Sequence, residues 1–527
     1  MLTNYMRILA LLAVLLLCSL GPICGSSFSQ HGLFWGGNAA SRAMIDTENT
    51  WQDIEDALVQ INLASARTVL VNYHIVVESI KSLSAVPLPS ENNKDVLQIR
   101  VLIDGTPYRH SSAYASTYLT EQRQFNELTG SFTAEIEDTA AHNITLQWKK
   151  VGNQVDSWRV SPPSLGSGYA LAVIADYEQI WSLQENNDVI LTAKGSWKDV
   201  SQTLEFYLEE DSTIVLGYSM SVSPKLNKFV KDRRQEYISS RFVIDGIAFT
   251  EGSETHGTGS WNPTAGTLNG YMSITLTAGV HEVYLQWRRM GEVFAAWTSA
   301  PTFLDGFAAS RNIFVISTKY DVPVIEDHTR SILVGDNNWH TVNDEIKTFT
   351  LSKPSAMLIQ YGLPVTQHTN PNLDSRYWSA LEEVQTRVMV DNVPYDYSKG
   401  GVRSGQGERG NAFASLGLIL EAGSHSISLQ WRSKDVDWTT LNNVDGGYMH
   451  SERLMVLISS ENNQPTVTLS GSDAGSGWVV NEDSSLFFQP FQIVDVDTQL
   501  SSGMPIELNI TTQYGYMHFG AAPVLSK

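Results

Sequence analysis

The sequence of 527 residues contains two cysteines, Cys18 and Cys24, and both fall within a short apolar leader. Cleavage of that leader would leave a chain without cysteine, so packing rather than disulfides must stabilise it. No stretch after the leader reaches the roughly 18 consecutive apolar residues of a transmembrane helix. Long segments with helical periodicity and caps are also absent, which favours a β-rich chain.

Local catalytic signatures are missing as well. The sequence has neither a Gly-x-Ser-x-Gly elbow nor a His-Glu-x-x-His pair. The run Gly405–Gly410 has the spacing of a dinucleotide-binding loop but lacks the strand before it and the helix after it. We therefore expect a chain that is not an enzyme, although carboxylates brought together only by folding remain open.

The charge balance disfavours nucleic acid as a partner. The formal net charge is −21, from 35 basic and 56 acidic residues, and such a surface repels phosphate backbones. An acidic surface suits calcium, whose ligands are carboxylate and carbonyl oxygens. The same acidity could equally serve to keep a β-rich protein in solution.

The N-terminus has the layout of a secretory signal peptide. One positive charge in Met1–Arg7 precedes an apolar run, Ile8–Leu17, and small residues follow at Gly25 and Ser26. We assign residues 1–26 to the leader and expect a secreted, extracellular or cell-surface protein. Retention of the leader as a membrane anchor is the alternative, but its apolar core is short for a bilayer.

A threefold internal repeat is the main positive feature. The tripeptide Leu-Gln-Trp recurs at steps of 139 and 144 residues, ending at Trp148, Trp287 and Trp431. Each copy has a tryptophan upstream, a strand running into a tight turn, and a second tryptophan downstream. The upstream tryptophans are Trp51, Trp197 and Trp339, and the turns are Asp104-Gly105, Asp245-Gly246 and Asp391-Asn392. Such a period indicates a tandem array whose copies are each large enough to bury a core.

The strands around each tripeptide alternate between apolar and polar residues, as half-buried β-strands do. Many short strands and turns rich in Gly, Asn and Asp predict an all-β fold of three tandem antiparallel β-sandwich or jelly-roll repeats. We place these repeats at residues 51–190, 191–330 and 331–460.

Several recurrent residues are candidates for function. A histidine lies six residues before each tripeptide tryptophan, at His142, His281 and His425. A metal ligand or pH sensor is one reading, and a strand-end residue bonded to a backbone carbonyl is the favoured one. The tripeptide tryptophans are expected in the core. The downstream tryptophans are expected in loops, as hydrophobic lids or, in the alternative, as exposed indoles that stack on a sugar; they are Trp158, Trp297 and Trp438.

The segment 465–527 departs from the repeat. Its patterns Asn-Glu-Asp-Ser at 481–484 and Asp-Val-Asp at 495–497 resemble those of bacterial-type cadherin-like modules, which form sandwiches in large surface adhesins. The resemblance implies an incomplete module and a calcium site formed by Glu482, Asp483, Asp495 and Asp497, with solvated turn carboxylates as the alternative. It also suggests that the chain is the front of a longer protein.

The repeats themselves resemble tumour-necrosis-factor-like jelly-roll modules, through the Gly-x-His…Leu-Gln-Trp-Arg pattern at 278–288 and 422–432. The first copy departs, with Asp138-Thr139-Ala140-Ala141 where the glycine would be. Two glycosylation sequons begin at Asn143 and Asn509. These features together predict a non-enzymatic structural or adhesion protein whose partners are surface proteins, matrix proteins or glycans. The alternative is a carbohydrate-binding protein or the binding region of a glycan-active enzyme.

Overall fold

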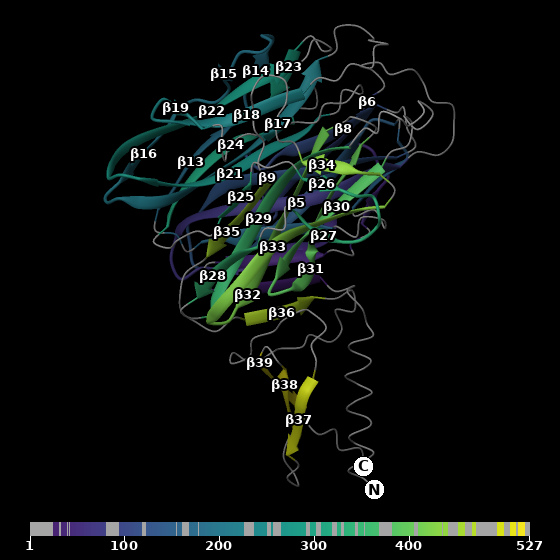
Figure 1. Cartoon of the computed structure of the whole chain (residues 1–527), viewed down its shortest axis with the longest axis vertical. Coiled ribbons are helices and arrows are strands. Elements are labelled where there is room, and N and C mark those ends of the chain that lie inside the picture. Colours follow the sequence, from purple (N-terminus) through teal and green to yellow (C-terminus); the bar gives the residue numbers. More distant parts are fainter. Residues whose placement is uncertain are drawn as a thin grey trace.

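The computed structural model describes the chain between Gly25 and Ala521, apart from loop segments. The longer of these segments are 81–93, 161–167, 226–236, 257–264, 368–381, 441–451, 459–465 and 471–492, and shorter breaks of up to six residues lie elsewhere. The described residues form β-strands and turns without an α-helix (Figure 1). The all-β prediction is therefore confirmed.

Each repeat is a sandwich of two antiparallel sheets, which we name inner and outer. In repeat 1 the inner sheet contains β2 (Leu33–Asn38), β3 (Met44–Ile45), β5 (Arg67–Ile80), β9 (Arg123–Ile136), β11 (Ser157–Val160) and β12 (Tyr169–Ile174). Its outer sheet contains β4 (Gln52–Asn62), β6 (Lys94–Ile103), β7 (Thr106–Pro107), β8 (Ala113–Tyr118) and β10 (Ala141–Val151).

Repeats 2 and 3 have corresponding sheets. The inner sheet of repeat 2 contains β13 (Ile180–Glu185), β14 (Val189–Leu191), β17 (Ser212–Lys225), β21 (Gly266–Leu276), β23 (Ala296–Ser299) and β24 (Arg311–Thr318). Its outer sheet contains β15 (Lys198–Asp199), β16 (Leu204–Leu208), β18 (Tyr237–Ile244), β19 (Ile247–Ala248), β20 (Thr255–His256) and β22 (Gly279–Met290). The inner sheet of repeat 3 contains β25 (Val324–Asp327), β26 (Ile332–Leu333), β29 (Ser355–Gln367), β32 (Arg409–Leu420), β34 (Trp438–Thr440) and β35 (Glu452–Ile458). Its outer sheet contains β27 (His340–Thr341), β28 (Lys347–Leu351), β30 (Glu382–Val390), β31 (Val393–Ser404) and β33 (Gly423–Ser433).

The tripeptide strands β10, β22 and β33 alternate as their sequences predict. Ile144, Leu146 and Trp148 turn into the sandwich core of repeat 1, and the intervening Thr145 and Gln147 face outward. Trp148, Trp287 and Trp431 occupy equivalent positions and are 1%, 1% and 2% exposed. The prediction that these three indoles are core anchors is confirmed.

The long central strands of the inner sheets, β5, β17 and β29, are buried on both faces. In β5 one set of alternating residues, including Val71 and Tyr73, enters the core of repeat 1, and the other set, including Leu70 and Asn72, is also buried. The second set faces a fourth core that all three repeats share. Its apolar members are Leu33, Trp35, Leu70, Ala170, Ala172, Ile174, Val215, Tyr271, Phe314, Ile316, Ala356, Leu358, Phe413 and Ile419.

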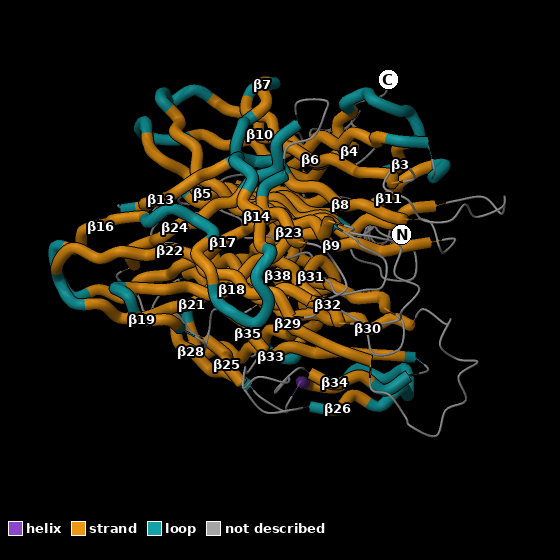
Figure 2. Tube along the Cα trace, turned by 90° about the horizontal axis from the view of Figure 1, so that it is seen from above, coloured by secondary structure: helices purple, strands orange, loops and turns teal. Residues whose placement is uncertain are grey.

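Polar groups join the three repeats inside this shared core. The Tyr271 hydroxyl lies 3.1 Å from Ser131 Oγ of repeat 1 and accepts a 3.1 Å hydrogen bond from Gln360 Nε2 of repeat 3. Its ring stacks on Phe413, with centroids 5.9 Å apart. Viewed from above, the repeats surround this junction with their outer sheets directed away from it (Figure 2). The repeats therefore form one body rather than a string of separate sandwiches.

The strand pairing shows that each repeat begins earlier in the chain than its predicted first residue. The first strand of each repeat pairs with its last, as β2 with β12, β13 with β24, and β25 with β35. The repeats thus begin near 33, 180 and 324, upstream of the predicted starts at 51, 191 and 331. The repeated sequence signature begins only at the upstream tryptophans, so these short first strands left no recurrent residue to detect.

The C-terminal segment is divided between two sheets. β36 (Thr466–Ser470) pairs with β1 (Gly25–Gln30), which in turn pairs with β2 in the inner sheet of repeat 1. β37 (Ile493–Gln499), β38 (Ile506–Thr512) and β39 (Gly515–Ala521) form a separate three-stranded sheet below the main body (Figure 1). β36, at the start of the segment assigned to a cadherin-like module, therefore belongs to another sheet than the rest of that segment. The cadherin-like and tumour-necrosis-factor-like assignments remain predictions.

Candidate functional site

The tight turns after β6, β18 and β30 are built alike. Their first residues, Asp104, Asp245 and Asp391, each have φ of 50°, and the glycine or asparagine that follows also has positive φ. Two successive positive φ values define the type I′ turn predicted for these pairs. Asparagine, aspartate and glycine tolerate this conformation best.

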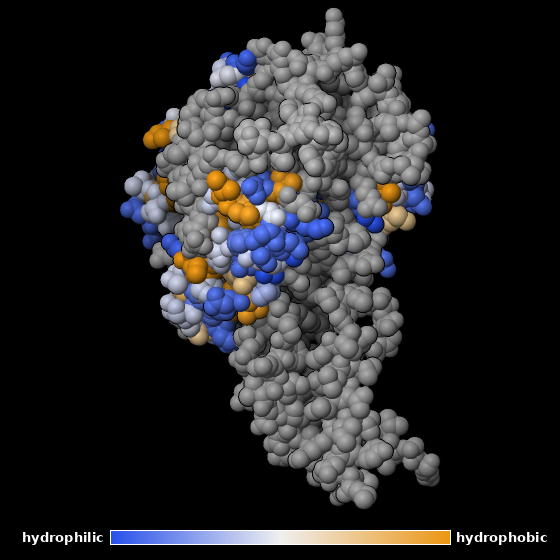
Figure 3. Space-filling view, turned by 45° about the vertical axis from the view of Figure 1, so that its right-hand side comes forward, coloured by the Kyte–Doolittle hydropathy of each residue, from blue (hydrophilic) through white to orange (hydrophobic). Residues whose placement is uncertain are grey.

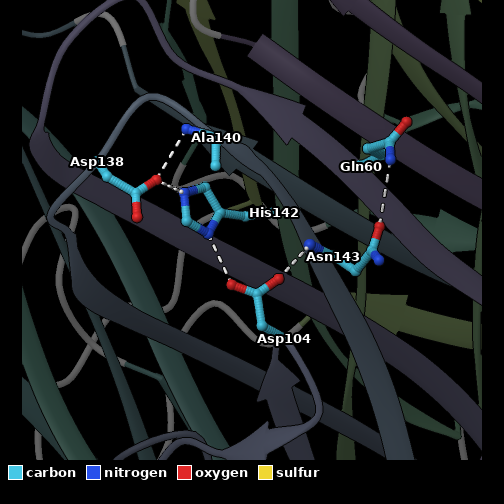
Figure 4. Close-up of polar contacts among 6 residues, drawn as sticks. All are labelled: Gln60, Asp104, Asp138, Ala140, His142 and Asn143. Atoms are coloured by element: carbon cyan, nitrogen blue, oxygen red, sulfur yellow. Dashed lines mark hydrogen bonds and ion pairs between the residues drawn. The ribbon is translucent and has the colours of Figure 1, made fainter.

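Each turn aspartate holds a histidine on the neighbouring tripeptide strand. In repeat 1, His142 Nδ1 lies 2.6 Å from Asp104 Oδ2, and Asp104 Oδ1 accepts a 2.8 Å bond from the backbone N–H of Asn143 (Figure 4). The corresponding Asp–His distances in repeats 2 and 3 are both 2.7 Å. The carboxylate thus fastens the turn to the start of the strand in every copy.

The other ring nitrogen distinguishes the copies. His281 Nε2 and His425 Nε2 each lie 2.8 Å from a backbone carbonyl, of Thr277 and Glu421. In repeat 1 the Asp138 carboxylate takes that place, 3.0 Å from His142 Nε2. The prediction of a strand-end histidine bonded to a carbonyl is confirmed in repeats 2 and 3, and the sequence departure at 138–141 explains the exception.

In repeats 1 and 2 these contacts favour the protonated imidazole. His142 and His281 each have an acceptor at both ring nitrogens, so only the doubly protonated form donates to both. The hydrogen bond to Asp104 raises the pKa of His142 despite partial burial. Burial lowers the pKa of His281, but its bonds to Asp245 and Thr277 outweigh that effect and the pKa is raised. The bond from Asn143 N–H lowers the pKa of Asp104.

A second recurrent cluster lies on the solvent side of each outer sheet. The Gln147 side chain accepts bonds of 3.0 and 2.8 Å from Arg100 Nε and Nη2, and donates a 2.7 Å bond to Asp53. The Arg100 guanidinium lies over the Trp51 ring, 3.9 Å from its centroid. We call this arrangement the tryptophan–arginine–glutamine cluster.

Repeats 2 and 3 contain the same cluster. Arg241 and Arg387 bond to Gln286 and Gln430 at 2.7–3.1 Å and lie 4.0 Å from the ring centroids of Trp197 and Trp339. A second cation flanks each indole at 4.6–5.0 Å: Lys149, Arg288 and Arg432. Asp199 accepts from Gln286 as Asp53 does from Gln147.

The cluster is partly open to solvent, because its tryptophan, arginine and glutamine are half-buried in all three repeats. It offers the exposed part of an indole that is stacked by a guanidinium, beside an amide and, in repeats 1 and 2, a carboxylate. These are the groups that hold a polar ligand with one apolar face, since the indole supplies contact area and the fixed polar groups supply orientation.

The downstream tryptophans do not form a ligand surface. Trp158, Trp297 and Trp438 are each 0% exposed. They lie on β11, β23 and β34, where they enter the cores of their own sandwiches. The prediction that they lie in loops is wrong, because the downstream segment is a short strand of the inner sheet and its parity directs the indole inward. Their burial also rules out the alternative in which they are exposed and stack on a sugar.

The predicted calcium ligands are only partly described. Glu482 and Asp483 lie outside the described residues. Asp495 and Asp497 lie on β37, paired with Thr511 and Asn509 across the sheet, and only their backbone is described. Among the residues that the structure describes, no cluster of three or more potential metal ligands is present. The calcium site therefore stays a prediction.

The sequon residues lie on strands. Asn143 is exposed on β10, and its side chain accepts a 3.5 Å bond from Gln60 (Figure 4). Asn509 lies on β38.

The described part of the chain contains no helix long and apolar enough to cross a membrane. Among the residues coloured in Figure 3, polar side chains are interspersed with small apolar groups.

The chain is thus an all-β protein of three β-sandwiches fused around a shared core. No protein-family model and no curated protein matches its sequence. Among solved structures, it is similar to a glycosylasparaginase of Flavobacterium meningosepticum at 13% identity, covering 55% of this chain and 100% of that one, with a TM-score of 0.26.

Two other solved structures are similar at comparable levels. The triple jelly-roll turret protein of an archaeal virus has 10% identity, a TM-score of 0.15 and coverage of 83% and 89%. The tandem CBM22 domain of Paenibacillus barcinonensis Xyn10C has 8% identity, a TM-score of 0.13 and coverage of 53% and 93%. Likeness at these TM-scores carries no argument about what this chain does.

One prediction is nevertheless corrected. The lack of a local catalytic motif led to the expectation that the chain is not an enzyme, yet the similar structures include a glycosylasparaginase. That expectation is wrong as a conclusion from sequence. Carboxylates that act together in glycan chemistry can come from distant strands, so the absence of a short motif has little weight.

Sequence reasoning missed the tryptophan–arginine–glutamine cluster. The arginine precedes the turn aspartate by four residues in every copy, as Arg100, Arg241 and Arg387. This recurrence was a detectable signal. It places the arginine on the outward face of the strand that neighbours the tripeptide strand, directly opposite the tripeptide glutamine.

Proposed function

We propose that this chain is an exported glycan-binding protein that acts alone or as the binding region of a larger glycan-active enzyme. The observation that supports the proposal is the threefold recurrence of the tryptophan–arginine–glutamine cluster on solvent-facing sheet surfaces. A sugar ring has apolar faces and a rim of hydroxyls, so its site needs an apolar plane beside fixed donors and acceptors.

The geometry of the cluster fits this role. The glutamine is held by both the arginine and, in repeats 1 and 2, an aspartate, so its amide is oriented before a ligand arrives. Such preorganisation reduces the entropy lost on binding. The acidic chain as a whole disfavours nucleic acid and leaves neutral or mixed polar ligands such as glycans. Adhesion to a cell surface or matrix is a narrower form of the same proposal.

A glycan array tests this function. We expect the intact protein to bind at least one glycan class, and a variant with Trp51, Trp197 and Trp339 all changed to leucine to lose binding at least tenfold, because leucine keeps apolar bulk and removes the aromatic plane. Tyr207→Leu is the matched control, since Tyr207 is an exposed aromatic on the outer sheet of repeat 2 outside the cluster. Equal binding by the triple variant would contradict the proposal.

A further inference from the structure

The three clusters occupy equivalent places on three separate surfaces. In each repeat the tryptophan directly precedes a strand that pairs with the tripeptide strand, so its indole lies beside the outward glutamine. That strand belongs to the outer sheet of its repeat. The three sites therefore have the same position within their sandwiches.

The shared core fixes the directions in which these surfaces face. The inner sheets of all three repeats contribute to that core, and each outer sheet lies on the far side of its own sandwich core. Since packed sheets are about 10 Å apart, each outer sheet lies roughly 15 Å from the junction. Figure 2 shows the outer strands β10, β22 and β33 on three different sides of the body.

From this arrangement we infer that the protein is a multivalent cross-linker of glycan chains. The inference rests on the proposed function and concerns the partner: a polymer or surface that displays many copies of one epitope. The three clusters are directed apart, and the body of the protein separates them. A short oligosaccharide can then occupy one cluster only, whereas separate chains can each occupy a different cluster.

The clusters are not identical in their surroundings. Trp51 also lies 5.9 Å from Phe307 of repeat 2, at a small apolar contact where repeat 2 covers part of the outer sheet of repeat 1. This contact leaves less of the Trp51 indole open to a ligand in the first cluster. We therefore expect two or three occupied sites per chain, with the first the weakest.

Titration calorimetry and turbidity test the inference with two probes: the best oligosaccharide from the array in free form, and the same oligosaccharide coupled in many copies to polyacrylamide. The free form should bind with a stoichiometry of two or three per chain. Trp197→Leu should lower the stoichiometry by one and leave the affinity of the remaining sites within about twofold. The coupled form should precipitate the intact protein.

Double variants give the sharper comparison. Trp51→Leu combined with either Trp197→Leu or Trp339→Leu leaves a single intact cluster. Such a double variant should still bind the free oligosaccharide but should no longer precipitate the coupled form. Tyr207→Leu should behave as the intact protein. Thermal melting checks that each variant is folded, and Gln286→Ala provides a second disruption of cluster 2 that leaves the indole. A stoichiometry of one, or precipitation by a double variant, would overturn the inference while leaving glycan binding intact. Failure of every oligosaccharide to bind would overturn both.

Discussion

At the residue scale, the histidine before each Leu-Gln-Trp tripeptide shows how one charged group can hold a strand end. The turn aspartate has positive φ and bonds both to the histidine ring and to the next backbone N–H. Its carboxylate therefore accepts a backbone hydrogen bond at the point where the turn interrupts the pairing of the two strands. The recurrence of these bonds in three copies indicates a structural role, and the copies differ only in what the second ring nitrogen contacts.

The first repeat should show the strongest pH dependence of this contact. The folded-state pKa of His142 is raised above its ordinary value of about 6.5, so its contribution to stability is complete below that pH and is lost as pH rises through the folded pKa. The depressed pKa of Asp104 sets the acid limit, below about pH 4. The contact is thus strongest between about pH 4 and 6.5.

We expect His142→Gln to lower the free energy of unfolding by about 1–3 kcal/mol at pH 5.5 and by less at pH 8.5. Urea denaturation at the two pH values measures the difference. Asp138→Asn is the informative companion, because it leaves one carboxylate on the ring and should reduce the pH dependence. A cost for His142→Gln that is the same at both pH values would contradict the assignment.

At the element scale, segments that were expected to be loops form short strands of the inner sheets. The downstream tryptophans lie on strands of three or four residues, β11, β23 and β34, and those strands insert beside the long central strands β5, β17 and β29. Insertion into a sheet makes the side chains alternate, which buries the indoles. A loop at the same place would have left them exposed.

The C-terminal strand β37 carries the one untested metal prediction. A calcium site needs about six to eight oxygen ligands, so Asp495 and Asp497 with Glu482 and Asp483 need further carbonyl or water oxygens. We expect calcium at millimolar concentration to raise the melting temperature of the C-terminal segment in the whole protein, by mass action on the folded state. Differential scanning calorimetry measures this.

Asp495→Asn combined with Asp497→Asn should remove the calcium response, and magnesium at equal concentration should not reproduce it, because magnesium requires a smaller octahedral shell. An unchanged melting profile with and without calcium would remove the chemical basis of the cadherin-like assignment.

At the scale of the whole molecule, three sandwiches behave as one body because the long central strands of their inner sheets are buried on both faces. Val215, Tyr271 and Phe314 of repeat 2 are buried against the other repeats. Exposing such residues costs roughly 1.5–3 kcal/mol for each large apolar side chain. The repeats therefore stabilise one another although each has a core of its own.

Repeat 2 expressed alone, as residues 179–318, should aggregate or melt well below the intact protein. Analytical ultracentrifugation and thermal melting measure both effects. The same fragment with Val215→Thr and Phe314→Ser should be more soluble, because these changes reduce the exposed apolar patch. A monomeric fragment with the melting temperature of the intact chain would show that the shared core contributes no stability.

The sequence alone determined the local structure of this protein. Strict alternation around Leu146 and Trp148 predicted half-buried strands and core indoles, and Asp104-Gly105 predicted the type I′ turn, because these features depend on neighbouring residues and backbone sterics. The recurrence of the tripeptide established three copies for the same reason. Each of these patterns consists of a few neighbouring residues, so it can be recognised without knowing the tertiary structure.

Only the tertiary structure decided how the copies meet. The faces that form the shared core carry Asn72 in repeat 1, Gly217 in repeat 2 and Gln360 in repeat 3 at one equivalent position. Strands that are buried on both faces do not alternate between apolar and polar residues, so their sequences do not show which face meets the other repeats. The same applies to the tryptophan–arginine–glutamine cluster, whose tryptophan lies just before one strand and whose arginine and glutamine lie on two other strands far apart in sequence. Contacts between distant strands depend on the packing of the whole chain, and this packing left the downstream indoles inside and the upstream ones partly open to solvent.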